Sequence, residues 1–210
     1  MAGTGGLPLV LVGAQEFAAV YDGPARNTAQ WIQRGVLGYE EAVIVSGRAY
    51  WSLGTAVAFG ETTERKKTPN MDVVEQLVAE QAPGRSVEAA LQLRAVGSLP
   101  IVGVQEILAL TGEDPTKAKL ITDAVNKGVF TAPDWRLSGS PLWLLPNALV
   151  GLDRMRERPK SRPLVVIPEV QKALEERTYD GPGSQILTGQ GRTKERREEL
   201  RKQAAEGAEG

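Results

Sequence analysis

The chain has 210 residues and a formal net charge of −1 at pH 7, with 41% hydrophobic residues and neither cysteine nor histidine. This length and apolar content suit one large domain or two small ones. Without cysteine and histidine the chain has no disulfides, thiolate nucleophile, imidazole base or histidine metal ligand. Most hydrolase and metalloenzyme mechanisms are thereby excluded, with carboxylate and lysine chemistry as the formal exception. We expect a protein that is not an enzyme and binds no cofactor or metal.

The N-terminal segment shows no sign of membrane targeting. Residues Met1–Gly13 lack a basic region, and no apolar run approaches the ~18 residues that cross a bilayer. We expect a soluble protein without a membrane partner. Its expected location is the cytoplasm, in contact with the nucleoid, or a phage particle if its role is structural.

An internal repeat organises the chain. The segment Leu11–Ala18 (LVGAQEFA) is similar to Ile101–Leu108 (IVGVQEIL), 90 residues later. Further matches follow in the same order and at nearly the same offset: Pro24 with Pro115, Gly35 with Gly128, Ser46-Gly47 with Ser138-Gly139, and Trp51 with Trp143. Repetition of this kind indicates two copies of one structural unit.

Each copy predicts two short helices joined by a turn. The first helices are expected at Gly13–Val20 and Gly103–Leu110. Pro24 and Pro115 suit the first position of the second helices, because proline lacks the N–H that would be unpaired there, and Asp114 suits an N-cap. Gly35 and Gly128 are placed to end these helices in a left-handed conformation.

A short hairpin and a third helix complete each copy. The hairpins are expected at Ala42–Trp51, turning at Ser46-Gly47-Arg48, and at Trp135–Leu144, turning at Ser138-Gly139-Ser140. The third helices are expected at Leu53–Phe59 and Pro146–Arg156. We therefore predict a mainly α protein with small β-hairpin wings, an α+β fold with two winged helix-turn-helix modules.

The predicted organisation has four parts. They are module 1 (residues 8–60), a partly helical linker (61–98), module 2 (99–158) and a C-terminal extension that is partly disordered (159–210). Within the linker and the extension we expect helices at Met71–Gln81, Val87–Val96, Glu169–Arg177 and Thr193–Ala205, a strand at Pro163–Ile167, and irregular structure at Tyr179–Gly191.

Module 1 resembles the winged helix-turn-helix of MerR-type regulators and phage excisionases. The resemblance covers Leu9–Phe59 and depends on Thr28–Gly35 (TAQWIQRG) followed by Ser46–Trp51 (SGRAYW). These match a second helix of the form T-x-x-W-x-x-x-G and a wing of the form S-G-R-x-x-W. Module 2 keeps the glycines and Trp143 but has Ala124 at the helix tryptophan and Ser140 at the wing arginine.

The resemblance implies binding of double-stranded DNA, with the second helix in the major groove and the wing on the backbone or in the minor groove. Arginine, asparagine and glutamine side chains recognise base edges, and further basic residues contact phosphates. The residues implied are Arg26, Asn27, Gln30, Arg34 and Arg48 in module 1, and Thr116, Lys117, Lys119, Lys127 and Arg136 in module 2. Trp31, Trp51 and Trp143 are expected in the module cores.

Two functions therefore remain open. The first is a sequence-specific DNA-binding protein, a transcription regulator or a recombination or plasmid accessory factor, whose linked modules read two half-sites. The second is a structural or adaptor protein of a phage particle or replication assembly, with winged modules that bind protein. Residues 8–59 of module 1 and residues 100–152 of module 2 each carry a net charge of −1, which favours the second. Self-association or a protein partner would use the linker or the C-terminal extension.

Overall fold

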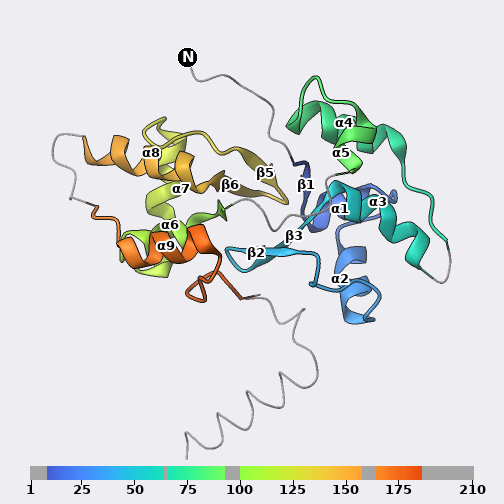
Figure 1. The fold of residues 1–210 in the computed structure, drawn as a ribbon, viewed down its shortest axis with the longest axis horizontal. Coiled ribbons are helices and arrows are strands. Elements are labelled where there is room, and N and C mark those ends of the chain that lie inside the picture. The colour runs from blue at the N-terminus through green and yellow to red at the C-terminus, as the bar shows by residue number, and fades with distance from the viewer. Residues whose placement is uncertain (1–8, 64–65, 93–99, 158–163, 186–210) are drawn as a thin grey trace, which may run out of the picture.

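The computed structural model describes residues 9–63, 66–92, 100–157 and 164–185. Helices and two small antiparallel sheets form two groups that lie side by side, module 1 on the right and module 2 on the left of Figure 1. The fold is therefore mixed α/β, in agreement with the α+β class expected from the sequence.

The two modules have the same order of elements. Module 1 contains β1 (Leu11–Val12), α1 (Ala14–Ala19), α2 (Arg26–Gln33), β2 (Val43–Val45), β3 (Arg48–Ser52) and α3 (Leu53–Thr62). Module 2 contains β4 (Ile101–Val102), α6 (Val104–Leu110), the 3₁₀ turn η2 (Pro115–Lys117), α7 (Ala118–Asn126), β5 (Trp135–Leu137), β6 (Ser140–Leu144) and α8 (Leu145–Arg156). The structural repeat thus follows the sequence repeat.

Each predicted hairpin forms, and each gains a third strand that we did not expect. The strand orders are β1-β3-β2 and β4-β6-β5, all antiparallel. At the turns, Ser46 and Gly47 have φ of 48° and 74°, and Ser138 and Gly139 have 48° and 76°. Two consecutive positive φ values characterise the type I′ turn, which matches the twist of a two-residue hairpin.

The prediction that proline opens the second helix of each module is wrong in detail. Pro24 lies two residues before α2, and its carbonyl accepts an i+3 hydrogen bond from the N–H of Asn27 at 2.8 Å. Pro115 opens η2, a 3₁₀ turn, with Asp114 as its N-cap. In both modules i+3 bonding tightens the entry to the helix. Gly35 and Gly128, at φ of 70° and 66°, end the helices as predicted.

The core of module 1 is aromatic and extends into the following segment. Phe17 contacts Trp31, Trp51 and Phe59, with ring centroids 5.3–6.0 Å apart. Helices α4 (Met71–Gln81) and α5 (Val87–Leu91) add Val74, Leu77, Val78 and Ala90 to the same core. The segment expected as a linker therefore packs on module 1 over its described residues; residues 93–99 lie outside them.

The core of module 2 is covered by the chain that follows it. Trp143 is fully buried among Ile107, Ile121 and Leu145, and Leu164 and Leu174 join this core. Helix α9 (Pro168–Glu176) confirms the predicted helix. The predicted strand at Pro163–Ile167 is wrong for residues 164–167, because they pair with no described strand. The N–H of Ile167 donates instead to the Leu110 carbonyl. The predicted helix Thr193–Ala205 lies outside the described residues.

A third apolar cluster joins the modules. It is formed by the two hairpins and the strands β1 and β4, and its members are Leu9, Leu11, Val45, Tyr50, Ile101, Trp135, Leu137 and Leu142. In Figure 1 the hairpin β2-β3 extends toward module 2 and the hairpin β5-β6 extends toward module 1. Because this cluster is buried, the two modules form one packed body.

Candidate nucleic-acid interface

Each hairpin turn binds the first turn of a helix in the other module. Glu106, the third residue of α6, accepts hydrogen bonds from the backbone N–H and the hydroxyl of Ser46, both at 2.7 Å. Glu16, the third residue of α1, accepts the same pair from Ser138, at 2.7 and 2.8 Å. We call these four residues the reciprocal clasp. It repeats the same chemistry in both directions, as in a dimer with twofold symmetry.

The clasp also caps both helices in trans. The hydroxyl of Ser138 accepts from the N–H of Gln15, and the hydroxyl of Ser46 accepts from the N–H of Gln105, each at 3.0 Å. The glutamates complete the caps by accepting from Gly13 and Gly103. In an ordinary capping box the hydroxyl belongs to the N-cap residue itself. Here the N-cap residue is glycine, and the other module supplies the hydroxyl.

Space for this hydroxyl explains the two N-cap glycines. A Cβ on Gly13 would lie 2.4 Å from Oγ of Ser138, and one on Gly103 would lie 2.3 Å from Oγ of Ser46. Both glycines have extended backbone with negative φ, so their conformation alone does not require glycine. Any side chain at these positions would displace the serine that caps the helix.

The C-terminal segment makes the two serine–glutamate contacts of the reciprocal clasp unequal. Gly183 lies against Glu106, and its carbonyl accepts from the N–H of Gly47 at 2.8 Å. As a result Glu106 is 3% exposed, whereas Glu16 remains partly exposed. Burial raises the pKa of Glu106 above its ordinary value, and the hydrogen bonds from Ser46 and Gly103 partly offset this effect.

The clasp gives the hairpin turns a different position from the one implied by the family resemblance. Their tips lie against the other module, and the guanidinium of Arg48 donates to the Ser138 carbonyl at 2.8 Å. Arg48 itself is exposed. Arg136 is also exposed, in the middle of β5. The turns are thus engaged within the protein, while the two arginine side chains remain accessible.

Helix α2 presents a polar face to solvent. Arg26, Gln30 and Arg34 are exposed at a spacing of four residues, which places them on one side of the helix. Asn27, also predicted as a site residue, is half-buried against Gly23 and is less accessible than these three. Gln33 is exposed on the same face and was missed. Its place one turn after Gln30 was the signal that could have identified it.

Helix α7 presents a similar face with a different charge pattern. Lys119 and Lys127 are exposed at its two ends, corresponding to Arg26 and Arg34. Between them Asp123, half-buried, takes the place of Gln30, and Asn126 takes the place of Gln33. We did not predict Asp123 or Asn126 as site residues. A carboxylate can accept a hydrogen bond from the amino group of cytosine.

Two of the predicted residues in module 2 have partners within the protein. The hydroxyl and N–H of Thr116 donate to Asp114, and these bonds hold the pKa of Asp114 below its ordinary value. Lys117 pairs with Glu113 at 2.7 Å while its side chain stays half exposed. Both residues lie in η2, before α7 begins. They are therefore less suited than Lys119 and Lys127 to contact an external phosphate.

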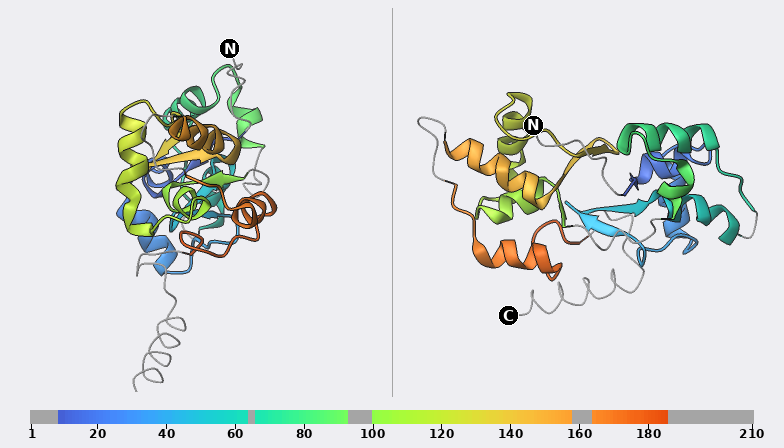
Figure 2. Two further views of the ribbon diagram at one scale, coloured as in Figure 1. Left: turned by 90° about the vertical axis from the view of Figure 1, so that its left-hand side faces the viewer. Right: turned by 45° about the horizontal axis from the view of Figure 1, so that its top comes forward.

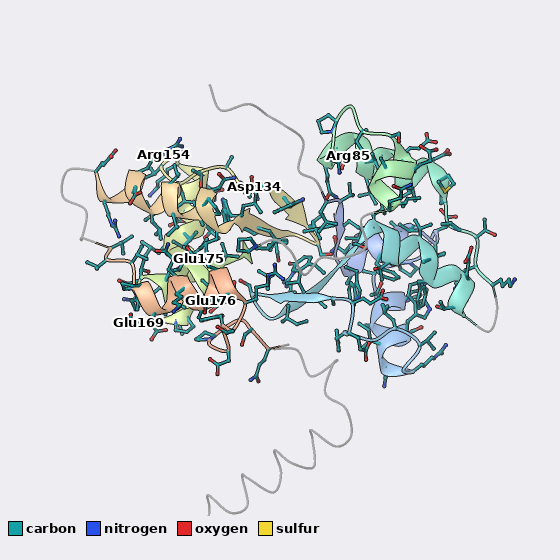
Figure 3. All side chains as sticks on the ribbon, in the orientation of Figure 1. Arg85, Asp134, Arg154, Glu169, Glu175 and Glu176 are labelled. Atoms are coloured by element: carbon teal, nitrogen blue, oxygen red, sulfur yellow. The ribbon has the colours of Figure 1, made fainter. Side chains whose placement is uncertain are left out.

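Helices α2 and α7 lie on the same side of the molecule. In the side view of Figure 2 (left), both helices lie along one edge, and α9 lies along the opposite edge. Helix α9 carries the exposed Glu169, Glu175 and Glu176, labelled in Figure 3. Some of the acidic residues that bring the net charge close to zero thus lie on α9, on the side away from α2 and α7.

Neither a membrane-spanning helix nor an acidic metal site is found in the part of the chain that the structure describes. No helix there is long and apolar enough to cross a bilayer, and no group of three or more acidic residues is arranged to hold a metal ion. Comparisons with models of known protein families, with curated protein sequences and with solved structures found no match to this chain.

Proposed function

We propose that this protein binds double-stranded DNA in a sequence-specific manner, with α2 and α7 as its two reading helices. The observation that carries the proposal is their arrangement: two corresponding helices with exposed polar residues lie on one side of the molecule, in modules joined through a buried interface. Proteins that read two half-sites place two helices in successive major grooves, about one helical turn (~34 Å) apart, and the proposal requires this separation of α2 and α7.

The side chains on α2 are suited to reading bases. The side chain of Arg26 makes no hydrogen bond or ion pair with any described residue, and neither does the side chain of Arg34. Arginine forms bidentate bonds to guanine, and glutamine, here Gln30, forms them to adenine. Because α7 has Lys119 and Asp123 in place of Arg26 and Gln30, we expect the second half-site to differ from the first. The preferred DNA site is therefore asymmetric.

Selection from random duplexes at two salt concentrations tests the proposal. We expect enrichment of a site with two unequal half-sites and an affinity that falls with salt, because lysine and arginine contacts release counterions. The Gln30→Ala variant should lose discrimination at one or two positions of one half-site, by about 1–3 kcal/mol per base pair. The Lys172→Ala variant on α9 is the matched control, since it removes an exposed cation from the opposite edge.

One observation favours a protein partner instead. A groove of about 550 Å³ between α7, α8 and the following segment is lined by Leu120, Met155 and Leu164, and its charged lining residues are Glu113, Asp123, Lys117 and Lys119. Leu120 is 38% exposed. An apolar groove with an exposed leucine suits a protein surface better than DNA. Under this alternative random duplexes yield no enriched sequence, and Leu120→Asp abolishes binding of the protein partner.

A further inference from the structure

A second groove lies beside the reading face of module 1. It has a volume of about 430 Å³ and opens between α1, α2 and the β2-β3 hairpin. Ala29 and Ile32 of α2 form one wall, and Tyr39 and Trp51 form another. The rings of Tyr39 and Trp51 are stacked, with centroids 6.3 Å apart and planes 18° from parallel. This volume is within the range of small-molecule sites, which are typically ~300–1,000 Å³.

The charge at this groove has one sign. Arg26 and Arg48 line it, and none of the described residues that line it is acidic. The bond from Arg48 to the Ser138 carbonyl fixes this guanidinium beside the groove and leaves its other N–H groups for a ligand. Arg26 has no partner among the described residues. A planar apolar surface beside two guanidinium groups is complementary to an aromatic ring that carries a carboxylate.

Module 2 lacks this combination of residues. In the repeat, Arg48 corresponds to Ser140 and Tyr39 corresponds to Ala132, so both a cation and the outer aromatic ring are absent. The pairing of Tyr39 with Ala132 follows from the tryptophans, because Nε1 of Trp51 donates to Gly38 and Nε1 of Trp143 donates to Thr131. The groove is therefore a feature of module 1 that the shared fold does not require.

We propose that this groove binds a small aromatic carboxylate and that the bound ligand prevents Arg26 and Arg48 from contacting DNA. The carboxylate accepts hydrogen bonds from the two guanidinium groups, and the ring lies against Tyr39, Ala29 and Ile32. The exclusion of DNA rests on the proposed function, whereas the binding of the carboxylate does not. Ligand binding and DNA binding compete because both require the same two arginines.

The experiment titrates the full-length protein with 2-naphthoate and with its neutral counterpart 2-naphthamide, followed by calorimetry. We expect saturable binding of one naphthoate per chain and at least tenfold weaker binding of the amide. Arg26→Ala and Arg48→Ala should each weaken naphthoate binding by about tenfold, the usual effect of removing one charge-assisted hydrogen bond. Lys119→Ala, at the position in module 2 that corresponds to Arg26, should leave it unchanged. Thermal melting of each variant checks that it folds.

Three results would overturn the proposed site: no saturable binding at millimolar naphthoate, equal binding of the amide, or binding unaffected by both arginine variants. A second titration adds naphthoate to the complex with the selected duplex and measures the loss of bound DNA. If naphthoate binds without displacing DNA, the proposed competition with DNA is overturned and the carboxylate site stands. Naphthoate that binds to a protein with no affinity for any duplex overturns the proposed DNA function and leaves the carboxylate site standing.

Discussion

Glu106 accepts two hydrogen bonds of 2.7 Å from Ser46, a residue 60 positions earlier that belongs to the other module. The equivalent contact joins Glu16 to Ser138. Since each serine also caps the helix of its glutamate, the two contacts connect the stability of each module to the position of the other. Loss of one serine therefore affects a helix terminus, a carboxylate and an interface together.

The two serines should differ in their contribution to stability. Ser46→Ala leaves the buried Glu106 without its hydroxyl donor and the N–H of Gln105 without a cap, so we expect a loss of about 2 kcal/mol. Ser138→Ala should cost about 1 kcal/mol, because water can reach the partly exposed Glu16. Urea unfolding of both variants provides the comparison. Equal losses would show that the C-terminal segment does not seal the Glu106 contact.

Glu106 should make stability depend on pH. Its folded-state pKa is raised by burial, so the folded protein favours the protonated carboxyl more than the unfolded chain does. The resulting stability is fully present below the ordinary carboxyl pKa of about 4.5 and is lost as pH rises through the folded-state value. The neighbouring tyrosines do not titrate in this range, since the pKa of Tyr179 is raised to about 12 and that of Tyr50 is also raised.

The measurement is the free energy of unfolding between pH 4 and pH 8 for the wild type and for Glu106→Gln. We expect the difference between the two proteins to shift in favour of the variant as pH rises. A difference that stays constant over this range would mean that Glu106 has the same pKa in the folded and unfolded states.

The N-cap glycines should tolerate no side chain while the clasp is intact. Gly103→Ala places a Cβ on the hydroxyl of Ser46, and we expect a cost of about 1–3 kcal/mol from overpacking. Adding Ser46→Gly removes the obstructing atoms, so the double variant should lose less stability than the sum of the two single variants. Strict additivity in this cycle would show that the glycine is not required for the space it leaves.

The clasp should also determine the spacing of DNA half-sites if the proposed function holds. In a Ser46→Ala/Ser138→Ala variant the modules keep the apolar contacts between their hairpins but lose both caps in trans. We expect the selected DNA sites to keep their half-site sequences and to vary more in half-site spacing. The same selection performed on the wild type is the reference. If the distribution of spacings is unchanged, the apolar cluster between the hairpins is sufficient to fix the relative position of the two modules.

The local elements followed from the sequence because short-range rules decide them. The repeat placed two equivalent units, Gly35 and Gly128 ended the second helices, and Ser46-Gly47 and Ser138-Gly139 formed the hairpin turns. The burial of Trp31, Trp51 and Trp143 is confirmed as well. The prediction of a strand was wrong where the outcome depended on a pairing strand. Residues 164–167 have the composition of a strand, but no described strand pairs with them.

In the candidate sites, too, some features could be predicted from the sequence and others depended on tertiary contacts. Exposure of Arg26, Gln30, Arg34, Lys119 and Lys127 could be expected from helical periodicity, whereas the engagement of Thr116 and Lys117 depended on Asp114 and Glu113. The groove beside Arg26 and Arg48 was not foreseen, because it requires the hairpin and α2 to be placed relative to each other. Such placement is set by packing rather than by local propensity.

By itself the sequence determined that this protein is built from two copies of one small α/β unit, since periodicity, turn glycines and repeated motifs act within a few residues. Only the tertiary structure decided how the copies meet. In each copy a glutamate, a serine and a glycine have the local pattern of ordinary helix and turn residues, and their pairing spans 60 residues in one direction and 122 in the other. Hydrogen bonds between such distant positions form only after the apolar hairpin faces have packed together, so they leave no local pattern in the chain.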